Sequence, residues 1–187
     1  MFLLKTKCTS VIKYGVQQVN VGESLLSRAQ MNGAKEIPLG FQFAFTQRGD
    51  TFDKVKIYES GYISIIQNKY FFAVYYLPEF RLASEIDSSN DDLQTTTGAI
   101  WYRNTRNRQD LDMISGFINQ ELYSYKTTER FSCQIAFVVT WENIVDDQNN
   151  TNTFQAVFAT DDGNVRSFVI YILYRCDTPL ASSYLPI

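Results

Sequence analysis

The sequence lacks histidine altogether, and this absence limits the chemistry that the chain can perform. Without an imidazole it cannot by itself build a Ser-His-Asp or Cys-His catalytic site, nor a metal site with histidine ligands. Cysteines are also scarce: 3 among 187 residues are too few for a disulfide scaffold, and an odd number cannot all pair within one chain. The longest apolar runs fall well short of the roughly 20 residues that span a bilayer.

The composition is that of a folded protein, with 45% hydrophobic and 20% charged residues. Aromatic residues make up 15%, which favours β-strands. The net charge is −3 and no basic face stands out, so the sequence predicts no nucleic-acid partner. The first eight residues include an apolar Phe-Leu-Leu but no apolar stretch of roughly 7–15 residues such as a secretory signal needs.

Several segments alternate apolar and polar residues, or are wholly apolar, as strands do. The predicted strands cover residues 40–45, 52–58, 62–66, 70–77, 98–103, 131–142, 153–160 and 168–174. Between the last two, Asp162-Gly163 indicates a tight two-residue hairpin, because a type I′ turn needs positive φ at its centre. The first 36 residues carry weaker signals, among them one predicted turn of helix over residues 24–30.

One segment has a helical period, which predicts a helix over residues 108–122 with one apolar stripe. The stripe consists of Leu111, Ile114, Phe117, Ile118 and Leu122. Asn107 suits the N-cap position, and Asp110 suits the first turn, where a negative charge interacts favourably with the positive end of the helix dipole. Gly116 in mid-helix costs up to about 1 kcal/mol relative to alanine, so we expect close packing against a sheet there.

Many short strands with one helix predict a mainly β fold, α+β at the margin. We expect antiparallel, sandwich-like sheets with one amphipathic helix packed on them. The expected division is an N-terminal extension over residues 1–36, a domain over residues 37–176 and a tail over residues 177–187.

Two segments near the C-terminus resemble the signature strands of a known family. Residues 136–143 read AFVVTWEN and residues 152–161 read NTFQAVFATD, with SFVI following at residues 167–170. This sequence resembles the NIDO domain, the extracellular module of nidogen, alpha-tectorin and certain membrane mucins. The resemblance is collinear from about Pro38 to Tyr174. The motif positions it singles out are Trp141, Asn152, Thr153, Phe154 and Gln155.

The resemblance implies a non-enzymatic, secreted module for cell–matrix adhesion, without a cofactor, whose partners are extracellular-matrix or cell-surface proteins. We therefore expect the sequence to be a fragment, or a gene model that lacks its signal peptide. A carbohydrate-binding β-sandwich is the alternative, with Trp101 and Trp141 as a platform on which sugars stack. The competing interpretation places these aromatic residues in the core.

The polar stretch over residues 83–97 offers two further hypotheses beside that of a solvated loop. Glu85 and Asp87 are the carboxylate pair that glycoside hydrolysis would use. Hard oxygen ligands suit calcium, although the spacing departs from an EF-hand loop. The weak candidate ligands are Asp87, Asn90, Asp91 and Asp92.

Three short features complete the candidates. Residues 48–50 spell the integrin-binding tripeptide Arg-Gly-Asp, which is also ordinary turn chemistry. Asn149 fits the N-glycosylation pattern in a polar loop. Cys133 lies on one predicted strand and Cys176 follows another that could be its neighbour, so the two are candidates for one disulfide, with Cys8 outside the recognisable domain. The alternative for Cys133 is a buried thiol.

Overall fold

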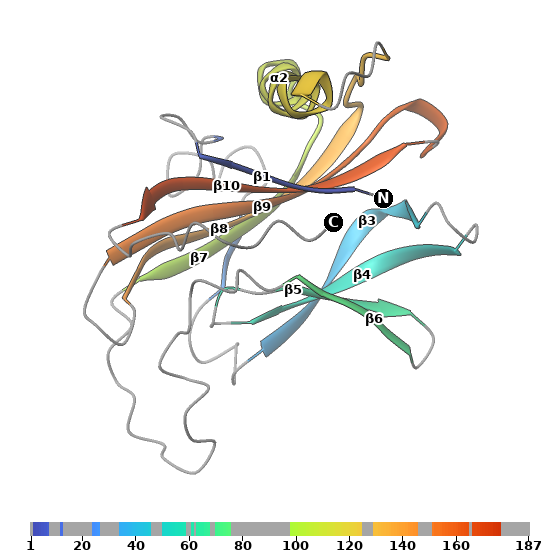
Figure 1. Ribbon diagram of the computed structural model, residues 1–187. Coiled ribbons are helices and arrows are strands. Elements are labelled where there is room, and N and C mark those ends of the chain that lie inside the picture. Colours follow the sequence, from blue (N-terminus) through green and yellow to red (C-terminus); the bar gives the residue numbers. More distant parts are fainter. Residues whose placement is uncertain are drawn as a thin grey trace.

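The computed structural model consists of three layers: a helix, a six-stranded sheet beneath it and a four-stranded sheet below that (Figure 1). The structure describes residues 2–7, 12, 24–26, 34–45, 50–58, 61, 63–67, 70–75, 98–124, 129–145, 151–164 and 166–176. The predicted mainly β, sandwich-like fold with one helix is confirmed.

The six-stranded sheet forms the middle layer, in the order β1-β10-β9-β8-β7-β2. Its strands are β1 (Phe2–Lys7), β2 (Ser24–Leu26), β7 (Ala99–Thr105), β8 (Ile135–Val145), β9 (Thr151–Thr160) and β10 (Ser167–Cys176). All neighbours pair antiparallel except β1, which runs parallel to β10. The N-terminal residues thus supply both edges of this sheet, and Ser24–Leu26 is a strand where the sequence predicted a turn of helix.

The four-stranded sheet is an antiparallel meander in the order β3-β4-β5-β6. Its strands are β3 (Ala34–Phe45), β4 (Asp50–Tyr58), β5 (Ile63–Gln67) and β6 (Tyr70–Tyr75). Gly61, with φ of 90°, lies in the connection from β4 to β5. In β3 the register shifts between Pro38 and Phe43, and Gly40 in this irregular stretch has φ of 73°.

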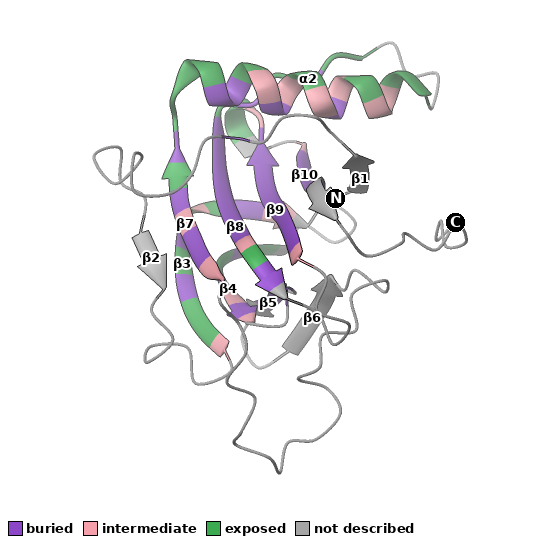
Figure 2. Cartoon of the chain, turned by 90° about the vertical axis from the view of Figure 1, so that its left-hand side faces the viewer, coloured by how far each residue is buried: buried purple, intermediate pink, exposed green. Residues whose placement is uncertain are grey.

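Two cores lie on opposite faces of the middle sheet. On β8, Phe137 and Trp141 belong to the core shared with the four-stranded sheet, while Ala136 and Val138 belong to the core beneath the helix. Because both faces are covered, β8 and β9 are buried along most of their length (Figure 2). This explains the near-continuous apolar composition of both strands.

Helix α2 (Arg108–Ser124) begins where the sequence predicted and ends two residues later. The Asn107 side chain caps it, since Oδ1 accepts hydrogen bonds from the backbone N–H groups of Gln109 (2.9 Å) and Asp110 (3.4 Å). The expectation for Gly116 is wrong: this residue is exposed, and, apart from its chain neighbours and the backbone of its own helix, no atom of the described residues lies within 4 Å of where its Cβ would be. Ile114 and Ile118 pack on the sheet instead.

The strand predicted from residue 131 begins later, at Ile135, because the preceding residues bond to α2. The Asn119 side chain accepts from the N–H of Phe131 (2.7 Å) and donates to its carbonyl (2.9 Å). The Ser115 hydroxyl likewise accepts from the N–H of Cys133 (2.9 Å). Side chains of the helix thus take the place of a neighbouring strand.

The hairpin between β9 and β10 is wider than the two-residue turn predicted at Asp162-Gly163. Its connection spans residues 161–166 and includes a 3₁₀ turn over Asp162–Asn164. Asp161 closes it, since its side chain accepts from the backbone N–H of Arg166 (2.8 Å) and pairs with its guanidinium (2.9 Å). The positive φ foreseen here is confirmed only at Gly163, which has φ of 72°.

Candidate functional site

The motif residues Asn152–Gln155 lie on β9, near the centre of the middle sheet, and all four are buried. Their side chains alternate between two environments. Phe154 belongs to the core between the sheets, whereas the next residue, Gln155, contacts the N-terminal segment. The motif therefore serves the interior of the domain.

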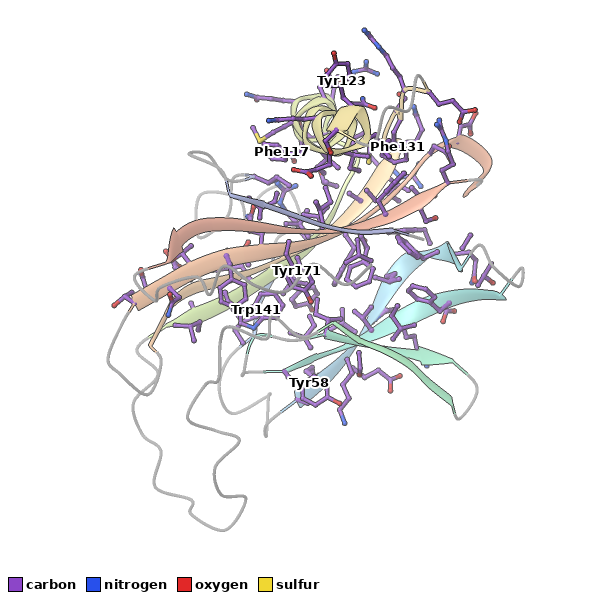
Figure 3. All side chains as sticks on the ribbon, in the orientation of Figure 1. Tyr58, Phe117, Tyr123, Phe131, Trp141 and Tyr171 are labelled. Atoms are coloured by element: carbon purple, nitrogen blue, oxygen red, sulfur yellow. The ribbon has the colours of Figure 1, made fainter. Side chains whose placement is uncertain are left out.

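Trp141 links the two sheets from the middle of the sandwich. Its ring stacks on that of Phe154, with centroids 5.0 Å apart and planes inclined by 17°. Its indole N–H donates to the carbonyl of Tyr58, at the end of β4, over 3.0 Å. Figure 3 shows Trp141 and Tyr171 in the layer between the sheets.

Trp101 is also a core residue, with 6% of its surface exposed, and its indole N–H donates to the Glu142 carboxylate over 2.9 Å. Trp141 is 0% exposed. A sugar-stacking platform needs exposed ring faces, so the platform proposed for this pair is wrong. The competing interpretation, a core role for both, holds.

A bulge in β8 connects the motif segment around Trp141 with the motif segment on β9. The register against β9 shifts between Trp141 and Ile144, and Asn143 there adopts a positive φ of 52°. The backbone N–H of Asn143 donates to the Thr153 hydroxyl over 3.0 Å. Gly98 lies against this bulge, where a Cβ would come within 2.4 Å of the Glu142 carbonyl oxygen. The bulge thus accounts for a glycine, an asparagine and a threonine at their positions.

Gln155 holds the N-terminal segment against the sheet. Its amide oxygen accepts from the backbone N–H of Ile12 (2.9 Å), and its amide nitrogen donates to the Ile12 carbonyl (2.7 Å). The same nitrogen donates to the Thr140 hydroxyl of β8 (2.8 Å). Sequence reasoning named Gln155 only as a motif position. The available signal was a long polar side chain between Phe154 and Ala156.

A buried ion pair fixes the start of the helix to β7. A guanidinium nitrogen of Arg103 lies 2.8 Å from the Asp110 carboxylate, and these side chains are 1% and 10% exposed. The Thr105 hydroxyl donates to the same carboxylate oxygen (2.8 Å). Asp110 therefore has a specific partner in addition to the predicted interaction with the helix dipole.

The structure does not bring the two candidate disulfide cysteines together. Cys176 pairs with Asn152 at one end of β9, whereas Cys133 lies beside Thr160 at the other end. Eight residue steps along a strand amount to about 25 Å. A disulfide requires Cα atoms roughly 4.4–6.8 Å apart. Cys133 is instead a buried free thiol, as the alternative stated.

Burial governs the chemistry of this thiol. Loss of solvation raises the pKa of Cys133 from 9.0 to about 12, although backbone hydrogen bonds at Thr160 and Ile135 oppose the shift. Its Sγ donates to the Ile135 carbonyl over 3.4 Å. The thiol is therefore protonated at neutral pH and a poor nucleophile.

The remaining candidates fall outside the described residues. These are Arg48, Gly49, Glu85, Asp87, Asn90, Asp91, Asp92 and Asn149. Asp50, the third residue of the Arg-Gly-Asp tripeptide, begins β4 and pairs with Phe45.

Two kinds of feature are absent from the described part of the chain. No group of three or more acidic or cysteine side chains there is placed to hold a metal ion. No helix within the same residues has the length and apolar character to cross a membrane.

Together these features define a three-layer β-sandwich module in which the motif residues build the interior. The family model of the nidogen-like domain matches residues 53–178, which is 126 of the 187 residues. The chain belongs to this family. Comparisons with curated proteins and with solved structures gave no match.

Proposed function

We propose that the chain is a non-enzymatic extracellular module that acts in cell–matrix adhesion by binding a matrix or cell-surface protein. The observation that carries the proposal is membership of the nidogen-like family. The interior use of the motif supports it. Trp141, Thr153 and Gln155 bond to other parts of the same domain, so a partner would bind elsewhere on the surface.

The outer face of α2 is the surface that we assign to the partner. Among the described residues, Tyr123 is the large hydrophobic side chain that stands exposed, at 82%. Figure 3 shows it on the side of the helix away from the sheets. Tyrosine is enriched at protein interfaces, because its ring gives contact area and its hydroxyl bonds. Exposed Gln120 and Asp112 lie on the same helix and would form a polar rim.

A solid-phase binding assay tests this function. The full chain would be applied to purified extracellular-matrix proteins and to cell layers, and we expect saturable binding to at least one. The variant Tyr123→Ser should weaken that binding about tenfold, as loss of an interface tyrosine does. Lys54→Ser is the matched control, because Lys54 is an exposed residue of the four-stranded sheet, in the layer farthest from α2.

Three results would separate the parts of the proposal. Absence of binding to every matrix protein and cell layer would overturn adhesion itself. Equal binding by Tyr123→Ser and the unchanged chain would keep adhesion and exclude the α2 surface. Binding that persists in a metal chelator is expected, because we propose that the module needs no cofactor. Loss of binding there would instead revive the calcium hypothesis for Asp87, Asn90, Asp91 and Asp92.

A further inference from the structure

The N-terminal segment contacts the middle sheet at three places that span its full width. β1 pairs with β10 at one edge, and β2 pairs with β7 at the other. Ile12, which lies between them in the sequence, bonds to Gln155 on the inner strand β9. Figure 1 shows β1 lying along β10 on the helix side of the molecule. β1 and Ile12 together are called the strap.

The chemistry of the Gln155 contact is that of strand pairing. A primary amide presents one carbonyl acceptor and N–H donors, as a peptide group does. Gln155 therefore accepts from the N–H and donates to the C=O of one residue, Ile12, much as a neighbouring strand would. It recognises main-chain atoms, while the Ile12 side chain is 0% exposed in the core beneath the helix.

The residues that form the slot for the strap all lie in another part of the chain. The polar elements of the slot are Gln155, the Thr140 hydroxyl that orients the amide, and the edge of β10. All of them lie within residues 53–178, the part that matches the family model, whereas the strap precedes that part. Acceptor and ligand are thus separate stretches of one chain.

We propose that this slot is an acceptor for an extended segment, and that it binds the strap of a second copy of the chain as well as its own. Each copy carries one strap and one slot, so reciprocal exchange would close a two-fold dimer. Every contact of β1 and Ile12 would be remade, and no new interface would be required. Undocking alone is disfavoured, because it leaves the buried Gln155 amide without its Ile12 partners.

Cysteine pairs placed in the observed register test the exchange. Thr6 pairs with Ile172 across β1 and β10, and adjacent strands lie about 4.8 Å apart, within the range that a disulfide spans. Full chains with Thr6→Cys and with Ile172→Cys would be mixed under oxidising conditions, in a background with Cys8 and Cys176 replaced by serine. We expect covalent dimers that link the two engineered positions, identified by mass spectrometry.

Two controls are needed to interpret the yield of covalent dimers. A single chain carrying both cysteines should form the disulfide internally, and its failure to do so would refute the docked register. Thr6→Cys mixed with Gln120→Cys, an exposed position on α2, measures random collision. A yield from the slot pair no higher than from this pair would overturn the proposal.

The rate of exchange then tests the role of Gln155. In a Gln155→Ala background the slot loses its bonds to Ile12, and dimer formation should become roughly tenfold faster because undocking limits it. Ser115→Ala removes a comparable hydrogen bond, to Cys133, and should leave the rate unchanged. Equal acceleration by both variants would show exchange through general unfolding and contradict the proposal. Neither result depends on whether the module binds matrix.

Discussion

The indole N–H of Trp141 donates to the carbonyl of Tyr58 over 3.0 Å, and this bond ties the two sheets together. Sandwich layers are held mainly by apolar contacts, which are not directional. A hydrogen bond from the middle of β8 to the end of β4 adds a fixed point between them. The tryptophan that marks the family motif is therefore a structural anchor.

Replacing Trp141 with phenylalanine should remove this anchor and keep most of the stacking on Phe154. We expect a loss of about 2 kcal/mol in the free energy of unfolding, because the part-buried Tyr58 carbonyl keeps the N–H of Gly61 (3.2 Å) but loses the indole N–H, and a small cavity opens. Denaturant unfolding would measure it. Trp101→Phe is the control, since the hydrogen-bond partner of Trp101, Glu142, is half-buried and reaches water. This variant should lose about 1 kcal/mol in the free energy of unfolding. Equal costs for the two variants would contradict the anchor role.

Sequence patterns predicted the local elements well, because period and capping are local properties. The alternation around Phe137 and Trp141 and the Asn107 cap both correspond to what the structure shows. The patterns could not show which side of β9 meets which layer. They therefore identified Gln155 only as a motif position, because its partner Ile12 lies 143 residues away in the sequence.

The buried pair of Arg103 and Asp110 should make Asp110→Asn strongly destabilising. The variant would remove the negative charge that lies 2.8 Å from a guanidinium that is 1% exposed, at a cost of about 3 kcal/mol. Thermal and denaturant unfolding would measure it. The matched control is Asp112→Asn, which breaks the pair with Arg108 in a setting where the side chains are 78% and 60% exposed. Its cost should lie within about 0.5 kcal/mol of zero, as for other exposed helix pairs.

The double variant Arg103→Met with Asp110→Leu separates the charge from the packing. Because both ionic partners are removed together, we expect it to recover most of the stability that Asp110→Asn loses. If the double variant were as unstable as the sum of the two single variants, the pair would not be coupled, and the interpretation would fail.

Two glycines should respond to alanine with opposite signs. At Gly98 a Cβ would lie 2.4 Å from the Glu142 carbonyl and 2.8 Å from that of Asn143, so the bulge must shift, at a cost of about 1–3 kcal/mol. At Gly116 the space is open and the backbone helical, so alanine should add up to about 1 kcal/mol. Melting temperatures of both variants would test this, and a shift of the same sign in both would refute it.

The error over Gly116 shows what a pattern cannot supply. A glycine in a helix signals either a close neighbour or tolerance of its cost, and only the position of the neighbouring layer decides between them. The same holds for Cys133, which lies just before β8, and Cys176, which ends β10, a strand of the same sheet. Their separation along β9 depends on the register of the strands, which the spacing in the sequence does not define.

The Cys133 thiol should make the folded state less stable as the pH rises above 9. Burial raises its pKa to about 12 in the folded protein, against 9.0 for an exposed thiol. Between these values the unfolded chain releases this proton and the folded chain retains it. The free energy of unfolding therefore falls with rising pH, by up to about 1.4 kcal/mol per pH unit from this group.

Urea unfolding of the natural chain and of Cys133→Ala, measured from pH 7 to pH 10.5, would isolate that contribution from those of tyrosine and lysine. Alanine leaves a small cavity, so the variant should be less stable at pH 7 by about 1 kcal/mol. The variant has no thiol to titrate at this position. The gap in the free energy of unfolding between the natural chain and the variant should therefore narrow above pH 9 and then change sign. A gap that stays constant across this range would mean that the Cys133 thiol titrates in the folded state as it does in water.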